Sequence, residues 1–118
     1  MKETPFKNKV IRYLTEINAW YIKYWAGAIY TKEGVPDILA CINGRFVGME
    51  LKGTNGRPKI LQLKKLKQIR EAGGIGVLLY PEDFEYFKDL LQGTESGKHW
   101  YLENKQKQQD WFNRLNEV

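Results

Sequence analysis

Two carboxylates and a lysine, Asp37, Glu50 and Lys52, are the residues of this chain whose types and spacing best suit chemistry. They flank Asn43-Gly44, and Asn-Gly is the strongest short signal for a two-residue hairpin turn because both residues tolerate positive φ. A two-residue turn, counted back along both strands, places Asp37 directly opposite Glu50. Opposed Cβ atoms lie roughly 4.5–5.5 Å apart, so two like charges there destabilise a sheet unless a cation lies between them.

Strand alternation adds the lysine to the same face. Glu50 and Lys52 are two residues apart and project together, whereas Leu51 points to the other side. Carboxylate oxygens, water and substrate phosphate are the ligands that Mg²⁺ prefers, and a nearby ammonium can orient a water or stabilise charge at phosphorus. The pattern predicts a site for phosphodiester hydrolysis. The competing interpretation is an exposed strand face that carries an ordinary salt bridge.

The amino-acid sequence around these residues resembles that of a known family. Gly34-Val35-Pro36-Asp37, then Glu50-Leu51-Lys52-Gly53, then Gln62 on the following helix are similar to the PD-(D/E)xK nuclease superfamily and to its small VRR-NUC members. Relatives of that family include the archaeal-type Holliday junction resolvases. The resemblance extends from about Glu3 to Pro81. It implies Mg²⁺ or Mn²⁺ held by Asp37, Glu50 and the Leu51 carbonyl, with Lys52 and Gln62 completing the catalytic set.

The resemblance carries further expectations. A glutamate on the first helix often completes the metal site in such families, which favours Glu3 over Glu16, although either could simply be a solvated helix charge. We expect a structure-selective endonuclease for Holliday junctions or other branched DNA. We also expect a homodimer without an organic cofactor, in the cytoplasm of a bacterium or a phage-infected host.

The segments around the motif predict a single domain, residues 1–118, of the α/β class with a central mixed sheet flanked by helices in the order αβββαβ. A strand, a helix and a strand in succession imply a right-handed parallel crossover beside Arg45–Lys52. The expected helices are Thr4–Asn18 with Thr4 as N-cap, Pro58–Ala72, Pro81–Gln92 and Asn104–Glu117. The expected strands are Ala19–Trp25, Asp37–Ile42, Arg45–Lys52 and Ile75–Tyr80, with loops at 26–33 and 93–98 and a short strand at His99–Glu103.

Basic residues near the motif suit a phosphate backbone. Arg57 and Lys59 lie on a glycine-rich connection, and Lys64 and Lys65 point outward from the next helix along with Lys67 and Arg70. A formal net charge of +5 and a pI of about 9.3 favour a polyanionic partner. One cysteine excludes an internal disulfide, and no apolar run approaches the ~20 residues of a membrane span, so a soluble protein is expected.

Aromatic residues outside the motif leave alternatives open. Trp20, Tyr21, Tyr24 and Trp25 favour core packing over base stacking, and His99 is expected at the surface. Trp100, Tyr101, Trp111 and Phe112 are candidates for dimer contacts. The competing functions are a non-catalytic nucleic-acid-binding module, an accessory subunit of a larger complex and, least favoured, a different metal-dependent hydrolase.

Overall fold

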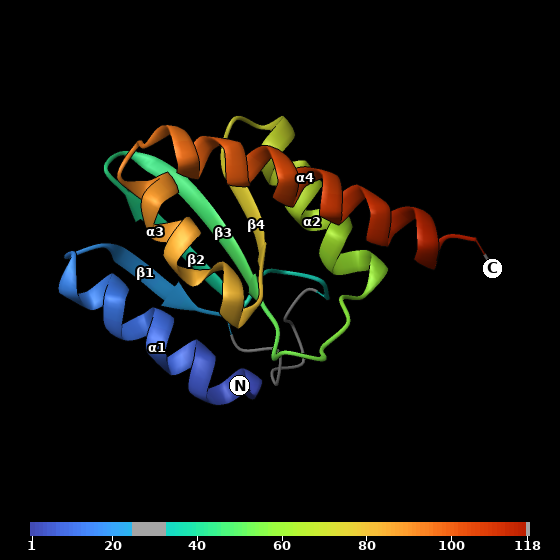
Figure 1. Cartoon of the computed structure of the whole chain (residues 1–118), viewed down its shortest axis with the longest axis horizontal. Coiled ribbons are helices and arrows are strands. Elements are labelled where there is room, and N and C mark those ends of the chain that lie inside the picture. The colour runs from blue at the N-terminus through green and yellow to red at the C-terminus, as the bar shows by residue number, and fades with distance from the viewer. Residues whose placement is uncertain (25–32, 118) are drawn as a thin grey trace.

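A computed structural model describes residues 1–24 and 33–117 of the chain. The fold is α/β, a four-stranded mixed sheet flanked by helices, as the sequence predicted (Figure 1). The strands lie in the order β1-β2-β3-β4. The elements are α1 (Glu3–Glu16), β1 (Trp20–Lys23), β2 (Ile38–Ile42), β3 (Arg45–Leu51), α2 (Ile60–Glu71), β4 (Ile75–Leu79), a 3-10 turn (Pro81–Asp83), α3 (Phe84–Leu91) and α4 (Glu95–Leu115).

The hairpin of β2 and β3 has the predicted register. Ile42 pairs with Arg45 and Leu39 with Gly48, and the two turn residues have φ of 51° and 79°. Both turn angles lie in the left-handed region that Asn and Gly adopt most readily. Strand β4 then pairs with β3 in parallel through α2, which confirms the crossover.

The two faces of the sheet bury two apolar clusters. On one face, alternate sheet residues such as Ile38, Met49 and Val77 pack against Phe6 of α1 and Phe87 of α3. On the other face, α2 and the end of α4 cover β4 through the cluster Leu63, Leu66, Leu78 and Tyr80, with Trp111, Phe112 and Leu115 packed against it. None of the helices in the described residues combines the length and the apolar character that a membrane crossing requires.

Helix α4 closes the outer edge of β4. It passes from the α3 side of the sheet to the α2 side (Figure 1). Asn104 accepts from the Leu78 amide at 3.1 Å and donates to the Leu78 carbonyl at 2.8 Å, while Gln108 donates to the Gly76 carbonyl at 2.9 Å. These side chains pair the backbone groups that a fifth strand would otherwise use, so β4 is not left as an exposed edge.

The prediction for the C-terminal third was wrong in one respect. Residues 95–98 of the predicted loop and the whole predicted strand at 99–103 are part of α4, whose N-cap Thr94 accepts a hydrogen bond from the Gly97 amide at 3.0 Å. Gly97, which lies within the predicted loop, allows α4 to approach α3. A Cβ built at Gly97 would lie 2.2 Å from the Leu90 nitrogen.

Several aromatic residues and one cap also differ from expectation. Trp20 is 66% exposed on the outer strand instead of buried, and Trp25 with residues 26–32 lies outside the described residues. The dimer-contact prediction is wrong for Trp100, which is buried in the core, and Trp111 packs within its own chain. Helix α1 begins at Glu3 with Lys2 as its N-cap, two residues earlier than the predicted N-cap Thr4.

Candidate metal and active site

Asp37 is held beside Glu50 by backbone contacts at the end of the β2–β3 pairing. It immediately precedes β2, and continuing the register Ile38 with Met49 brings it opposite Glu50. The Leu51 amide donates to its Oδ2 at 2.8 Å, and its carbonyl accepts from the Tyr24 amide at 2.8 Å. The structure therefore brings together the two carboxylates that the turn count placed side by side.

Glu50 is a buried acid with an incomplete set of partners. Its side chain is 2% exposed, and the next strand places Leu78 beside it. The Lys52 ammonium lies 3.4 Å from Oε2, but Oε1 has no hydrogen-bond partner among the described residues. Burial raises the pKa of Glu50 to about 8, the negative charge of Asp37 adds to the rise, and Lys52 opposes it.

The donor set fits a divalent cation. Two ionised carboxylates both accept and cannot hydrogen-bond to each other, so either a proton on Glu50 or a shared cation must resolve their contact. The carboxylates of Asp37 and Glu50 with the Leu51 carbonyl are hard oxygen donors of the kind that Mg²⁺ prefers. The unpartnered oxygen of Glu50 is the observation that favours the cation.

Lys7, which the sequence argument missed, occupies the space on the other side of Asp37. Its ammonium lies 3.4 Å from Asp37 Oδ1 and 3.7 Å from Glu3. The spacing of Glu3 and Lys7 signals an ordinary pair on one helix, whereas the contact with Asp37 depends on tertiary packing.

The helix glutamates do not complete a metal site in this structure. Glu3 contacts Lys7 and is half exposed, and Glu16 lies at the far end of α1. Within residues 1–24 and 33–117, no three His, Cys, Asp or Glu side chains lie close enough to hold a metal ion together. The structure brings together the carboxylates of Asp37 and Glu50, and the Leu51 carbonyl as a further donor stays a prediction.

Gln62 lies in the same cavity as Asp37. This cavity of about 510 Å³ is also lined by Lys59 and Gly34. Gln62 Oε1 accepts from the Lys59 amide at 2.8 Å and so caps the start of α2, a structural role that leaves its amide nitrogen to act as a donor. Gly34 has φ of +82° and packs against α2, where a Cβ would lie 2.8 Å from the Leu61 carbonyl oxygen.

The predicted phosphate-contacting residues surround this region. Arg57, Lys59 and Lys64 are exposed and Lys65 is half-buried. Arg70, predicted to point into solvent, instead donates to Gln108 of α4. Arg57 also lines a second hollow with Lys107 and Trp111, two residues of α4 for which the sequence predicted no contact with nucleic acid.

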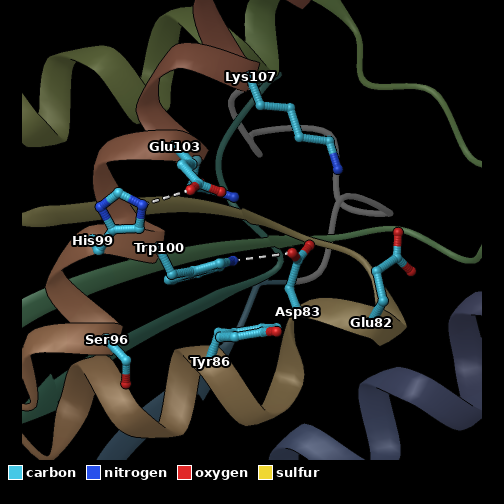
Figure 2. Close-up of a pocket in the computed structure, with 9 residues that line it drawn as sticks. Glu82, Asp83, Tyr86, Ser96, His99, Trp100, Glu103 and Lys107 are labelled. Atoms are coloured by element: carbon cyan, nitrogen blue, oxygen red, sulfur yellow. Dashed lines mark hydrogen bonds and ion pairs between the residues drawn. The ribbon is translucent and has the colours of Figure 1, made fainter.

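A larger pocket of about 640 Å³ lies between α3 and α4, away from the carboxylate pair (Figure 2). Its buried acid, Asp83, accepts from Trp100 Nε1 at 3.1 Å and from the Tyr80 amide at 2.8 Å, so both oxygens are occupied. His99 is exposed, as expected, and lies 2.9 Å from Glu103. Asp83 and His99 are therefore engaged in contacts within the protein.

Comparison with family models, with curated proteins and with solved structures found no match for this chain. The resemblance to PD-(D/E)xK nucleases therefore depends on the motif residues alone.

Proposed function

We propose that the chain is a metal-dependent endonuclease of the PD-(D/E)xK type, similar to VRR-NUC proteins, that hydrolyses DNA phosphodiester bonds. The observation that carries this proposal is the buried Glu50 with one unpartnered oxygen beside Asp37. A carboxylate in that position destabilises the fold unless a ligand uses it, which is typical of functional sites.

Asp37, Glu50 and the Leu51 carbonyl would hold Mg²⁺ or Mn²⁺. The bound metal supplies polarisation of a phosphoryl oxygen and lowers the pKa of a coordinated water. The chain itself fixes the donors, because the Leu51 amide holds Asp37 and the strand holds Glu50.

Lys52 is suited to act on the attacking water and on the phosphate. Its backbone is fixed by a hydrogen bond from its amide to the Leu79 carbonyl at 2.9 Å, and its side chain is 11% exposed. An ammonium held in a nearly dry site stabilises the charge that develops at phosphorus much more strongly than one in water.

The remaining residues would position the substrate. Gln62 and Lys59 line the cavity that contains Asp37, and the exposed Arg57 and Lys64 extend a cationic surface for the DNA backbone. We also propose that the enzyme prefers branched DNA and acts as a homodimer, because the motif resemblance implies both properties.

One observation favours a second candidate, a non-catalytic nucleic-acid-binding module. Lys7 and Lys52 each pair with one of the two carboxylates, so the acids have cationic partners without a metal. Such a module would bind DNA equally well in EDTA and would cleave nothing.

Cleavage assays separate the two candidates. Labelled four-way junction, flap, single-stranded and duplex DNA are incubated with Mg²⁺, Mn²⁺ or EDTA, using the wild type, Glu50→Gln and Lys52→Met. The matched control is Lys98→Met, an exposed lysine that pairs only with a neighbour on its own helix. Metal-dependent cleavage that disappears in both site variants and persists in the control supports the nuclease. Unaltered DNA binding with no cleavage by the wild type overturns it.

A further inference from the structure

A second hollow connects the loop after β3 with α4. It measures about 270 Å³ and is lined by residues of the loop, of the turn after β4 and of α4, and we call it the α4 groove: Thr54, Asn55, Gly56, Arg57, Tyr80, Glu82, Lys107 and Trp111. Three of its residues, Thr54 to Gly56, also line an adjoining hollow that reaches Glu3. Glu3 in turn pairs with Lys7, and Lys7 pairs with Asp37, so the far end of the adjoining hollow lies two ion pairs away from the candidate active site.

The groove has a fixed shape. The Tyr80 hydroxyl donates to the Gly56 carbonyl at 2.7 Å, and the Thr54 amide donates to the Met1 carbonyl at 3.0 Å. Both hydrogen bonds hold the glycine-rich loop in place, one to the end of β4 and the other to the start of α1. A polar loop held in this way can line a binding surface without a large loss of conformational entropy.

Lys107 and Arg114, two cations of α4, lie over aromatic rings that line the groove, and Arg114 itself lies beyond the lining residues. Lys107 Nζ lies 4.2 Å from the centre of the Tyr80 ring, and the Arg114 guanidinium lies 4.7 Å from the centre of the Trp111 ring. Glu82 and Lys107 line both the groove and the neighbouring pocket, and Figure 2 shows Lys107 extending from α4 on the side of Glu82. Arg57 adds a third cation from the loop, and Glu82 is the one acid among the residues that line the groove.

These features suit nucleic acid whose bases are unstacked. Single strands bind where a cationic groove follows the phosphates and a flat side chain, or an arginine plane, accepts a base. Bases inside a duplex are already stacked and cannot reach the pair formed by Arg114 and Trp111. We infer that the α4 groove binds a single-stranded extension of the DNA that is cleaved at the Asp37–Glu50 site, an inference that rests on the proposed nuclease function. Substrates with a flap, an arm or a splayed junction would then be preferred over continuous duplex.

Binding in EDTA tests the groove without any need for catalysis. The probe is a fluorescein-labelled oligothymidylate of about 12 nucleotides, within the range one small domain covers, beside a duplex of equal length. We expect Trp111→Leu to raise the Kd for the single strand about tenfold. Lys107→Gln should raise it a few-fold and lower the salt slope by about 0.7, the value for one lost phosphate contact. Neither variant should change the Kd for the duplex by more than about twofold.

Matched controls isolate the groove from general charge and from folding. Lys105→Gln removes a lysine of the same helix that also lies over a tyrosine ring, 4.9 Å from the Tyr101 centre, and Trp20→Leu removes an exposed tryptophan of β1. Both should bind the single strand as the wild type does. Because Trp111 also packs against the second core cluster, Arg114→Gln provides a variant that leaves that packing intact.

Two results would overturn single-strand binding in the groove. The variants could weaken single-strand and duplex binding equally, or Lys107→Gln and Arg114→Gln could leave the Kd for the single strand unchanged. Its failure is distinguishable from failure of the nuclease proposal. If the wild type shows metal-dependent cleavage and all groove variants bind the single strand as the wild type does, only the groove proposal is rejected. If the groove variants lose only single-strand binding and the wild type cleaves nothing, the groove is supported as a binding site and only the nuclease proposal is rejected.

Discussion

Replacing Glu50 by glutamine should make the metal-free protein more stable at neutral pH. The carboxylate is buried beside Asp37 and Leu78, and its cationic partner among the described residues is Lys52 at 3.4 Å. An amide of nearly the same shape carries no charge, and its NH₂ group can donate to Asp37 where an ionised carboxylate can only repel it. The substitution thus removes the conflict and keeps the volume.

The size of the effect follows from the pKa of Glu50, which rises from its ordinary value of 4.5 to about 8 on folding. A raised pKa means that the folded state binds the proton more tightly, so stability is fully present below pH 4.5 and is lost as the pH rises through 8. Each pH unit between these values costs about 1.4 kcal/mol of unfolding free energy. At pH 7 the cost is roughly 3 kcal/mol, which corresponds to about 10 °C in Tm for a chain of this size.

Thermal or urea unfolding in EDTA between pH 5 and 8 measures the effect. We expect Glu50→Gln to gain stability over the wild type as the pH rises, while the matched control Glu85→Gln stays parallel to the wild type. Glu85 also pairs with a lysine, at 3.0 Å from Lys88, but it is 75% exposed. Adding Mg²⁺ should stabilise the wild type, because a ligand of the folded state raises its free energy of unfolding, and should leave the variant unchanged.

One result would refute this reasoning. This result is that Glu50→Gln is less stable than the wild type by the same amount at every pH. Lys52 alone would then stabilise the ionised carboxylate of Glu50, and no further cation would be needed.

Three further predictions concern the neighbours of this acid. Lys52→Met should lower the rate of metal-dependent cleavage at least about a hundredfold while Mg²⁺ still raises Tm, and loss of the Tm shift would mean that Lys52 acts through metal binding instead. Lys7→Gln should tighten Mn²⁺ binding several-fold in calorimetry, because it removes a cation 3.4 Å from Asp37 that competes with the metal. Unaltered affinity would place the metal elsewhere. Asn104→Leu should cost about 2–3 kcal/mol in urea unfolding, because it leaves the Leu78 amide and carbonyl without partners. A cost below about 0.5 kcal/mol would show that water replaces these hydrogen bonds.

The pairing of the two site carboxylates could be predicted from the sequence because it depends on residues close together in the chain. The Asn43-Gly44 turn fixes the register of two adjacent strands, and the register alone brings Asp37 to Glu50. Burial of Glu50 was not readable, because it depends on β4 and α2, which join the sheet later in the chain. Lys7 was missed for the same reason, since nothing near it in sequence indicates its contact with Asp37.

The C-terminal region shows why local preference misled. Gly97 and the aromatic residues after it favour a loop and a strand when judged alone. The helix forms because its polar residues find partners on β4, and such pairing has no signature in a window of ten residues. The prediction that Trp20 is buried was wrong for a different reason. A sequence rich in β-forming residues indicates a strand, but it does not indicate whether another element will cover that strand.

The side chains of α4 along β4 also limit how copies of this protein can associate. They occupy one border of the sheet, so within the described residues the border open to strand addition is that of β1, where Trp20 and Ile22 are exposed. Two copies that joined through β1 would each use their single open border and leave none for a third. As far as the described residues determine it, sheet extension would therefore end at a symmetric pair.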